Sequence, residues 1–206
     1  MAGGLFVTFE GVEGAGKSTQ VRLLADNLSR AGMQSVVTRE PGGTPLGERV
    51  RALLIDPGAD MSRETEALLL NSSRAELVDK TIAPALRAGK LVVCDRFWDA
   101  TLAYQGYGRG LPLDNLQQLN LFAARGLTPD LTFLLDIPLD ISRQRLQGRS
   151  TDRMERENQA FHERVARGYR ELAAANAQRF VVLDGTQPQA QVAAQVLDAV
   201  LKRWHA

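Results

Sequence analysis

The segment from residue 11 to 18 reads GVEGAGKS, and it constrains the fold of this chain more than any other feature. It matches the phosphate-binding pattern G-x-x-x-x-G-K-[ST] at every fixed position. Glycines let the backbone curl so that its N–H groups surround an anion, and the helix that follows directs its positive end to the same point. Lys17 adds a charge for the outer phosphates, and the Ser18 hydroxyl suits Mg²⁺. The residues expected to contact a nucleotide here are Gly11, Val12, Glu13, Gly14, Ala15, Gly16, Lys17, Ser18 and Thr19.

The charge balance limits the partners of the chain. It has 25 basic and 24 acidic residues, so no overall field favours nucleic acid or a membrane surface, and we expect neither partner. The one cysteine, Cys94, lies in an apolar run, which excludes an internal disulfide and a cysteine-based zinc site and predicts a buried, inert thiol. Any anion binding must therefore come from local basic clusters.

The length and the patterning predict one domain, residues 1–206. No linker or shift in composition divides the chain. The N-terminus lacks a charged flank followed by a long apolar core, and no apolar run reaches membrane-spanning length, so we expect a soluble, cytoplasmic protein.

Short apolar runs alternate with longer amphipathic segments along the whole chain. The alternation predicts an α/β fold with a doubly wound, five-stranded parallel sheet flanked by helices. Ligands bind such sheets at the carboxyl ends of the strands. The predicted strands are 5–10, 35–38, 90–95, 131–136 and 180–183. The predicted helices are 17–31, 45–55, 64–88, 113–125, 140–147, 155–176 and 188–204.

Two strands end in a carboxylate that could lie near Mg²⁺ or its waters. Asp95 follows four apolar residues, in the form of a Walker-B strand, and Asp136 ends a similar run. We favour Asp95, because Arg96 follows it and could grip a phosphate with two hydrogen bonds. The alternative for Asp95 and Arg96 is a simple ion pair at the edge of the sheet.

Two further segments could supply cations. The turn TREPGGT at 38–44 places Arg39 after the second strand, where it could reach a second phosphate or belong to an ordinary turn. The segment at 143–156 carries many arginines around a Gly-Ser-Thr stretch, typical of a solvated face but also of a lid that closes over a transferred phosphoryl group.

Together these pieces resemble the thymidylate kinase family, whose members move the γ-phosphate of ATP onto dTMP. The resemblance implies a P-loop nucleoside monophosphate kinase fold, ATP as co-substrate, Mg²⁺ and a homodimer. The matching segments are Phe9-Glu10-Gly11, the turn at 39–44, Asp95-Arg96-Phe97, Ala103-Tyr104-Gln105-Gly106, the arginine-rich lid and the ending at 183–188.

The resemblance also implies roles for single residues. On the acceptor side, Glu10 resembles the carboxylate near the sugar and phosphate, Arg39 and Arg96 the phosphate grip, Arg74 the contact to the thymine carbonyl edge, and Tyr104 the ring under the deoxyribose. The other implied dTMP contacts are Pro41, Leu70, Thr101 and Gln105. On the donor side Arg143 and Asp184 would border adenine, and the implied catalytic groups are Lys17, Asp95, Arg96, Arg149 and Arg153, with Mg²⁺ at Ser18 and Asp95.

The sequence departs from the family pattern at two positions. One branch of the family has a catalytic arginine in the phosphate loop, but this chain has Gly14, so the role falls to the lid, with Arg153 the best match and Arg149 the second. Leu70 stands where the family usually has a phenylalanine that stacks on thymine, and Phe97 could compensate.

Three other functions are less well supported. A deoxynucleoside kinase would share the loop but would not need two arginines at strand ends for an acceptor phosphate. A GTPase switch would need an N-K-x-D and a D-x-x-G motif, which the chain lacks. A nucleic-acid-dependent ATPase would need a second basic groove. The predicted chemistry is therefore direct in-line phosphoryl transfer without a covalent intermediate.

Overall fold

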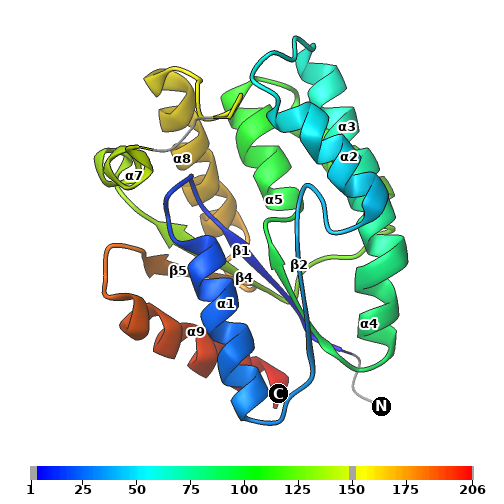
Figure 1. Cartoon of the computed structure of the whole chain (residues 1–206), viewed down its shortest axis with the longest axis vertical. Coiled ribbons are helices and arrows are strands. Elements are labelled where there is room, and N and C mark those ends of the chain that lie inside the picture. The colour runs from blue at the N-terminus through cyan, green and yellow to red at the C-terminus, as the bar shows by residue number, and fades with distance from the viewer. Residues whose placement is uncertain (1–3, 149–151, 206) are drawn as a thin grey trace.

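The computed structural model describes residues 4–148 and 152–205 and contains a five-stranded sheet with helices on both faces (Figure 1). The strands are β1 (Phe6–Glu10), β2 (Ser35–Arg39), β3 (Leu91–Asp95), β4 (Leu131–Asp136) and β5 (Phe180–Asp184). They pair in the order β2-β3-β1-β4-β5, and every pairing is parallel. This confirms the predicted doubly wound parallel sheet.

The register of the sheet brings its functional strand ends together. Asp95 lies opposite both Phe9 of β1 and Arg39 of β2, and Asp136 lies opposite Asp184. The chain continues from β1 to both sides of the sheet, because β3 pairs with one edge of β1 and β4 with the other. The order of the strands therefore reverses next to β1. Ligands bind in the crevice at such a reversal, and the loop at 11–16 leaves β1 there.

The helices form two layers over the sheet. The α-helices are α1 (Lys17–Arg30), α2 (Pro45–Ile55), α3 (Arg63–Leu77), α4 (Ala83–Arg87), α5 (Trp98–Thr101), α6 (Leu113–Ala123), α7 (Leu139–Leu146), α8 (Gln159–Ala175) and α9 (Gln189–Trp204). Two π-helical segments, η1 (Val78–Ile82) and η2 (Leu102–Gly108), continue α3 and α5. Alternate residues of β1 enter different cores, because Phe6 packs among residues of η1 and α4 whereas Val7 packs in the cluster that contains α1 and α9. Both faces of the central strand β1 are therefore buried.

Two predicted helices differ in the structure. The helix predicted at 64–88 is not uniform, since η1 separates α3 from α4 directly before Pro84, which has no N–H to donate back along the helix. The helix predicted from residue 155 begins at Gln159, because the Asn158 side chain caps it by accepting from the Phe161 N–H at 2.9 Å.

We did not predict the helical stretch at 98–108, because no local pattern indicates it. It contains two glycines, a threonine and two tyrosines, all weak helix formers. Tertiary packing stabilises it instead, since η2 lies against α8, where Gly108 and Gly168 allow close contact. Within the described residues, no helix is long and apolar enough to cross a membrane.

Candidate active site

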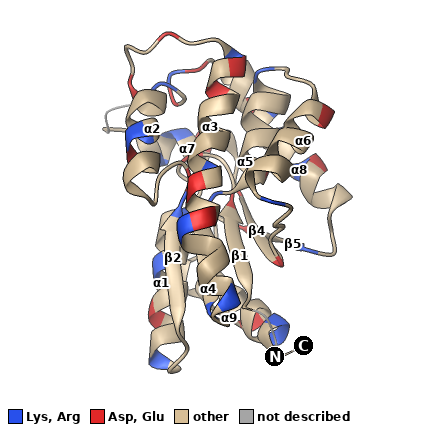
Figure 2. Cartoon of the chain, turned by 90° about the vertical axis from the view of Figure 1, so that its right-hand side faces the viewer, with Lys and Arg blue, Asp and Glu red and all other residues tan. Residues whose placement is uncertain are grey.

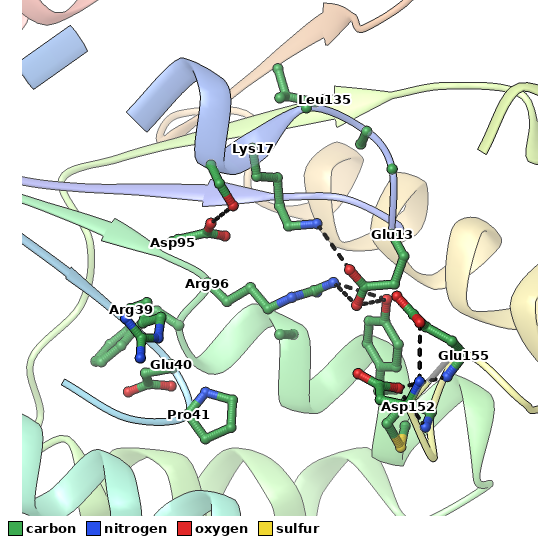
Figure 3. Close-up of a pocket in the computed structure, with 18 of the residues that line it drawn as sticks. Glu13, Lys17, Arg39, Glu40, Pro41, Asp95, Arg96, Leu135, Asp152 and Glu155 are labelled. Carbon is green, nitrogen blue, oxygen red and sulfur yellow. Dashed lines mark hydrogen bonds and ion pairs between the residues drawn. The ribbon is translucent and has the colours of Figure 1, made fainter. Parts of the chain in front are cut away.

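A cavity of about 590 Å³ opens at the carboxyl ends of β1, β2 and β3 (Figure 3). The phosphate loop forms one side of it, and α2, α3 and η2 form the other. The predicted site residues that line it are Glu13, Gly14, Ala15, Gly16, Lys17, Ser18, Thr19, Arg39, Pro41, Leu70, Arg74, Asp95, Arg96, Thr101, Tyr104, Gln105 and Arg153. Glu10, Gly11, Val12, Arg143 and Asp184 are not part of the lining, and Arg149 lies outside the described residues.

The phosphate loop holds its lysine in place with backbone oxygens. Gly16 has a φ of 101° and precedes the first residue of α1, Lys17. Lys17 Nζ donates to the carbonyls of Gly11 and Val12 at 3.0 and 2.9 Å. Burial and the charge of Arg96 lower the pKa of this ammonium group. The phosphate loop thus holds the buried Lys17 ammonium group next to its own backbone.

Ser18 and Asp95 lie side by side at the start of α1 and the end of β3. The Ser18 hydroxyl donates to Asp95 Oδ2 at 2.5 Å. The rival carboxylate, Asp136, pairs with Arg170 of α8 at 2.9 and 3.0 Å. Of the two strand-end carboxylates considered from the sequence, Asp95 is therefore the one next to the phosphate loop.

Arg96 crosses the cavity from β3 to the phosphate loop (Figure 3). Its φ of 70° is unusual for a residue other than glycine, and its N–H donates to the Phe9 carbonyl at 2.9 Å. The guanidinium contacts Glu13 Oε1 at 2.5 Å and the Tyr104 hydroxyl at 3.1 Å, and it lies over the Tyr104 ring. This sharp turn after the strand directs the cation into the site.

Glu13 belongs to the phosphate loop, where the sequence analysis expected it to contact the nucleotide. Its carboxylate instead contacts the Arg96 guanidinium and lies 3.9 Å from the Lys17 ammonium group. Burial would raise the pKa of Glu13, but the Arg96 guanidinium and the Lys17 ammonium lower it to about 2. Its carboxylate therefore stays ionised and joins the loop to the Arg96 and Tyr104 side.

Glu10 lies beneath Arg96 rather than in the cavity wall. Its carboxyl group accepts from the Phe97 N–H and from the Tyr169 hydroxyl, both at 2.8 Å, and Tyr169 in turn accepts from Arg96 at 2.8 Å. Complete burial and the nearby charge of Asp99 raise the pKa of Glu10 to about 8. Glu10 thus supports Arg96 through Tyr169.

Arg74 is fixed by four side chains in the wall of the cavity. It is 1% exposed, and it donates to Glu40, Asn71, Asn120 and Thr101 at distances of 2.6 to 3.1 Å. Its guanidinium lies 5.3 Å from the centre of the Phe97 ring. Leu70 and Phe97 both line the cavity, so the phenylalanine considered as a substitute for stacking is close to the predicted base contact.

The charged residues that line the cavity and that the sequence analysis did not single out include Arg51, Glu66 and Arg145. Arg51 shares one face of α2 with Leu54 and Ile55, and this i, i+3, i+4 spacing could have indicated it. Arg145 donates to the carbonyls of Gly14 and Gly185 at 3.1 and 3.0 Å. Glu66 gave no sequence signal, because its partners are distant in the chain.

The two residues predicted to border adenine, Arg143 and Asp184, lie at different distances from the cavity lining. The Arg143 side chain does not line the cavity, and its guanidinium donates to Gln159 Oε1 at 2.9 Å. Asp184 accepts from the N–H and the hydroxyl of Thr186 at 2.8 and 2.6 Å, which forms a tight turn whose Gly185 lines the cavity.

The described part of the lid lies against the far wall of the cavity. Arg153 Nε donates to the Leu54 carbonyl at 3.1 Å, and its Nη2 contacts Glu66 Oε2 at 2.5 Å. The predicted lid cation therefore reaches α2 and α3, on the side of the cavity opposite the phosphate loop.

A phosphate loop after β1, facing arginines from β2 and β3 across one cavity in a doubly wound sheet, defines a P-loop nucleoside monophosphate kinase. The profile of the family "Thymidylate kinase" matches residues 9–196. The chain belongs to the thymidylate kinase family.

Comparisons with individual proteins agree. The chain is 48% identical to the thymidylate kinase of Deinococcus radiodurans over 206 residues, which cover all of both chains. It is 49% identical to that of a Synechococcus species over 199 residues, which cover 97% of this chain and 96% of the relative. The crystal structure of thymidylate kinase from Ehrlichia chaffeensis superposes with a TM-score of 0.78 at 36% identity, and the match covers 96% of this chain and 99% of that one.

Proposed function

We propose that this protein transfers the γ-phosphate of ATP to dTMP, giving dTDP and ADP. The observation that carries the proposal is the division of one cavity into a donor half, formed by the phosphate loop with Lys17, and an acceptor half with Arg39 and Arg96. A kinase acting on an unphosphorylated nucleoside would not need the acceptor-half arginines. Family membership supports the same reaction.

The proposed chemistry is in-line transfer, in which a dTMP phosphate oxygen attacks the γ-phosphorus and the β–γ bridging oxygen leaves with ADP. The dTMP phosphate dianion is already nucleophilic near neutral pH, so the step does not depend on a strong general base. Catalysis is then positioning and neutralisation of charge by Lys17 and Arg96 together with a lid arginine. Arg39 and Arg51, on the acceptor side of the cavity, would hold the attacking phosphate.

We assign Mg²⁺ to Ser18 and Asp95. Their adjacent oxygens suit a hard cation that keeps most of its waters, and the described residues hold no group of three or more His, Cys, Asp or Glu side chains that would suggest a fuller protein cage. When bound, the ion would neutralise charge on the phosphates of ATP.

The acceptor base would lie between η2 and α3. Arg74 and Thr101 would face the thymine carbonyl edge with Gln105 beside them, while Leu70, Pro41 and the Tyr104 ring would supply apolar contact. Arg143 and Asp184 stay predictions for the adenine side. Arg145 and Gly185 would border it as well, since both line the cavity and bond to each other.

The lid would supply the catalytic cation that the phosphate loop lacks at Gly14. Arg153 is the first candidate for this role, and Arg149 is the second. We expect Arg153→Ala to lower kcat at least about tenfold, the size of loss seen when one charge-stabilising donor is removed. Near-normal kcat in the folded variant would contradict the assignment.

A coupled ADP-release assay tests the whole proposal. With ATP and Mg²⁺ we expect dTMP to have the highest kcat/KM among dTMP, dUMP, dCMP, AMP, GMP and thymidine. A higher kcat/KM for another monophosphate would contradict dTMP as the substrate but not the nucleoside monophosphate kinase activity. Preference for thymidine would indicate a deoxynucleoside kinase.

We also propose that the protein is a cytoplasmic homodimer that pairs through the face formed by α2, α3 and α6. These helices pack in succession (Figure 2). Leu68 of α3 and Phe122 of α6 are 55% and 84% exposed, and exposed apolar patches mark protein–protein interaction sites. Sedimentation should give about twice the chain mass, and Phe122→Glu should shift it to the monomer; a monomeric parent protein would contradict the proposal.

A further inference from the structure

One buried carboxylate joins the base side of the cavity to the lid. Glu66 of α3 is 1% exposed and accepts from three side chains. Its Oε1 accepts from Gln105 Nε2 at 2.7 Å and from Arg109 Nε at 3.2 Å. Its Oε2 accepts from Arg109 Nη2 at 3.1 Å and contacts Arg153 Nη2 at 2.5 Å. The base-side amide and the lid arginine therefore share one rigid group.

The contact with Glu66 decides which atom Gln105 presents to the cavity. A carboxylate can only accept hydrogen bonds, so it binds the NH₂ end of the amide and leaves Oε1 on the other side. Gln105 is 2% exposed and lines the cavity, and within the described residues no donor reaches its Oε1. The cavity thus contains a buried acceptor that requires a donor from a ligand. The N3–H of thymine is such a donor, whereas N3 of cytosine is an acceptor.

The same carboxylate limits where the lid arginine lies. Arg153 is held at two points, by Glu66 and by the carbonyl of Leu54. Arg109 is bound bidentately between the two oxygens, and its Nη1 contacts Glu157 at 2.5 Å. Burial raises the pKa of Glu66, but the hydrogen bonds from Arg109, Gln105 and Arg153 lower it overall, so the group stays ionised near neutral pH.

We propose that Glu66 is a positioning residue that couples base recognition to the lid, one oxygen fixing the Gln105 amide with its acceptor toward the pyrimidine and the other holding the lid residue Arg153 against the wall of the cavity. The inference rests on the proposed function and adds to it a determinant of pyrimidine selectivity. An amide at position 66 could donate as well as accept, so it would let Gln105 turn over and would release Arg153 from a charge-assisted bond.

The experiment compares Glu66→Gln with Glu157→Gln. Each removes one negative charge that contacts Arg109, but only Glu66 touches Gln105 and Arg153 among the described contacts. For Glu66→Gln we expect kcat with ATP and dTMP to fall about tenfold, and the ratio of kcat/KM for dTMP over dCMP to fall severalfold. Glu157→Gln should stay within about twofold of the parent protein in both.

Double variants separate positioning from simple loss of structure. If Glu66 acts through Arg153, adding Glu66→Gln to Arg153→Ala should lower kcat no further. If it acts through Gln105, adding it to Gln105→Ala should leave the dTMP/dCMP ratio unchanged. Additive losses in both pairs, or parental kcat and selectivity in Glu66→Gln, would overturn the inference.

A second cycle serves if Glu66→Gln does not fold. Gln105→Ala should lower kcat more in the parent than in the Arg153→Ala background, and equal effects would overturn the coupling. A parent protein without activity on dTMP would overturn the proposed function together with this inference, whereas an active parent with additive losses would overturn the inference alone.

Discussion

Four of the arginines that line the cavity are each paired with a carboxylate. Arg96 contacts Glu13, Arg39 contacts Glu48, Arg74 contacts Glu40, and Arg153 contacts Glu66. An isolated buried guanidinium would be costly, and the pairing removes most of that cost while fixing the direction of the side chain. The cations that would bind phosphate are therefore preorganised.

Lys17 should be required for turnover because it is the buried cation of the phosphate loop. We expect Lys17→Ala to lower kcat at least about tenfold in the ADP-release assay. Lys202→Ala is the matched control, since Lys202 is exposed and pairs with Asp198 on α9. Equal activities of the two variants would contradict the role of Lys17.

Glu10 should make stability depend on pH. Its pKa in the folded protein is about 8 against an ordinary value of 4.5, so between these values the folded state keeps a proton that the unfolded state has lost. The stabilisation is complete below about pH 4.5 and is lost as the pH rises through about 8. We expect the free energy of unfolding, measured with denaturant, to fall from pH 5 to pH 8. Glu10→Gln should reduce that slope, and an unchanged slope would refute the assignment.

At the scale of elements, the π-helical segment η2 shapes the base side of the cavity. A π-helix has a wider turn than an α-helix, and such segments often occur at functional sites. Thr101, Tyr104 and Gln105 all face the cavity from α5 and η2. This arrangement depends on α8, against which η2 packs.

Gly168 of α8 should be needed for that packing. A Cβ there would lie 2.5 to 2.8 Å from Cβ, Cγ and Cδ2 of Tyr107, which are atoms near the backbone and cannot move aside freely. Gly168→Ala would gain about 1 kcal/mol in helix propensity but lose more to overpacking, so we expect a net destabilisation of about 1–2 kcal/mol.

Denaturant unfolding measures this effect, and Ala174→Gly is its control. Ala174 is an exposed position of the same helix, so its change to glycine reports propensity without a packing term. If Gly168→Ala were more stable than the parent protein, Gly168 would not be required for the close packing of η2 on α8.

At the scale of the whole molecule, a buried ion pair ties the helical layer to the sheet. Arg179, just before β5, donates to both oxygens of Asp99 in α5 at 2.8 Å and to Thr132 of β4 at 3.0 Å. Asp99 is fully buried. The pair therefore connects segments 80 residues apart in sequence.

Loss of this pair should destabilise the fold strongly. Asp99→Asn would leave the Arg179 charge buried without its counterion, and we expect the free energy of unfolding to drop by about 3 kcal/mol. Asp136→Asn, which breaks the more exposed pair with Arg170, should cost less than about 1 kcal/mol. Similar losses in both variants, measured by denaturant unfolding, would contradict the importance of burial.

Much of the fold and half of the site could be predicted because their signals are local. The phosphate loop, the apolar runs and the residues at strand ends lie within a few positions of one another, so Lys17, Ser18, Asp95 and Arg96 could be found and assigned to one edge of a parallel sheet. Continuous apolar runs alternating with helical periodicity admit few other architectures.

The other half of the site depends on contacts that the sequence does not record. Glu66 meets Arg153 across 87 positions, and Glu13 meets Arg96 across 83, and no local pattern marks such partners. The helical stretch at 98–108 has weak propensity and forms because α8 covers it. Hydrophobic burial fixes which segments adjoin, and only then do distant charges come close enough to pair and to hold the arginines in direction.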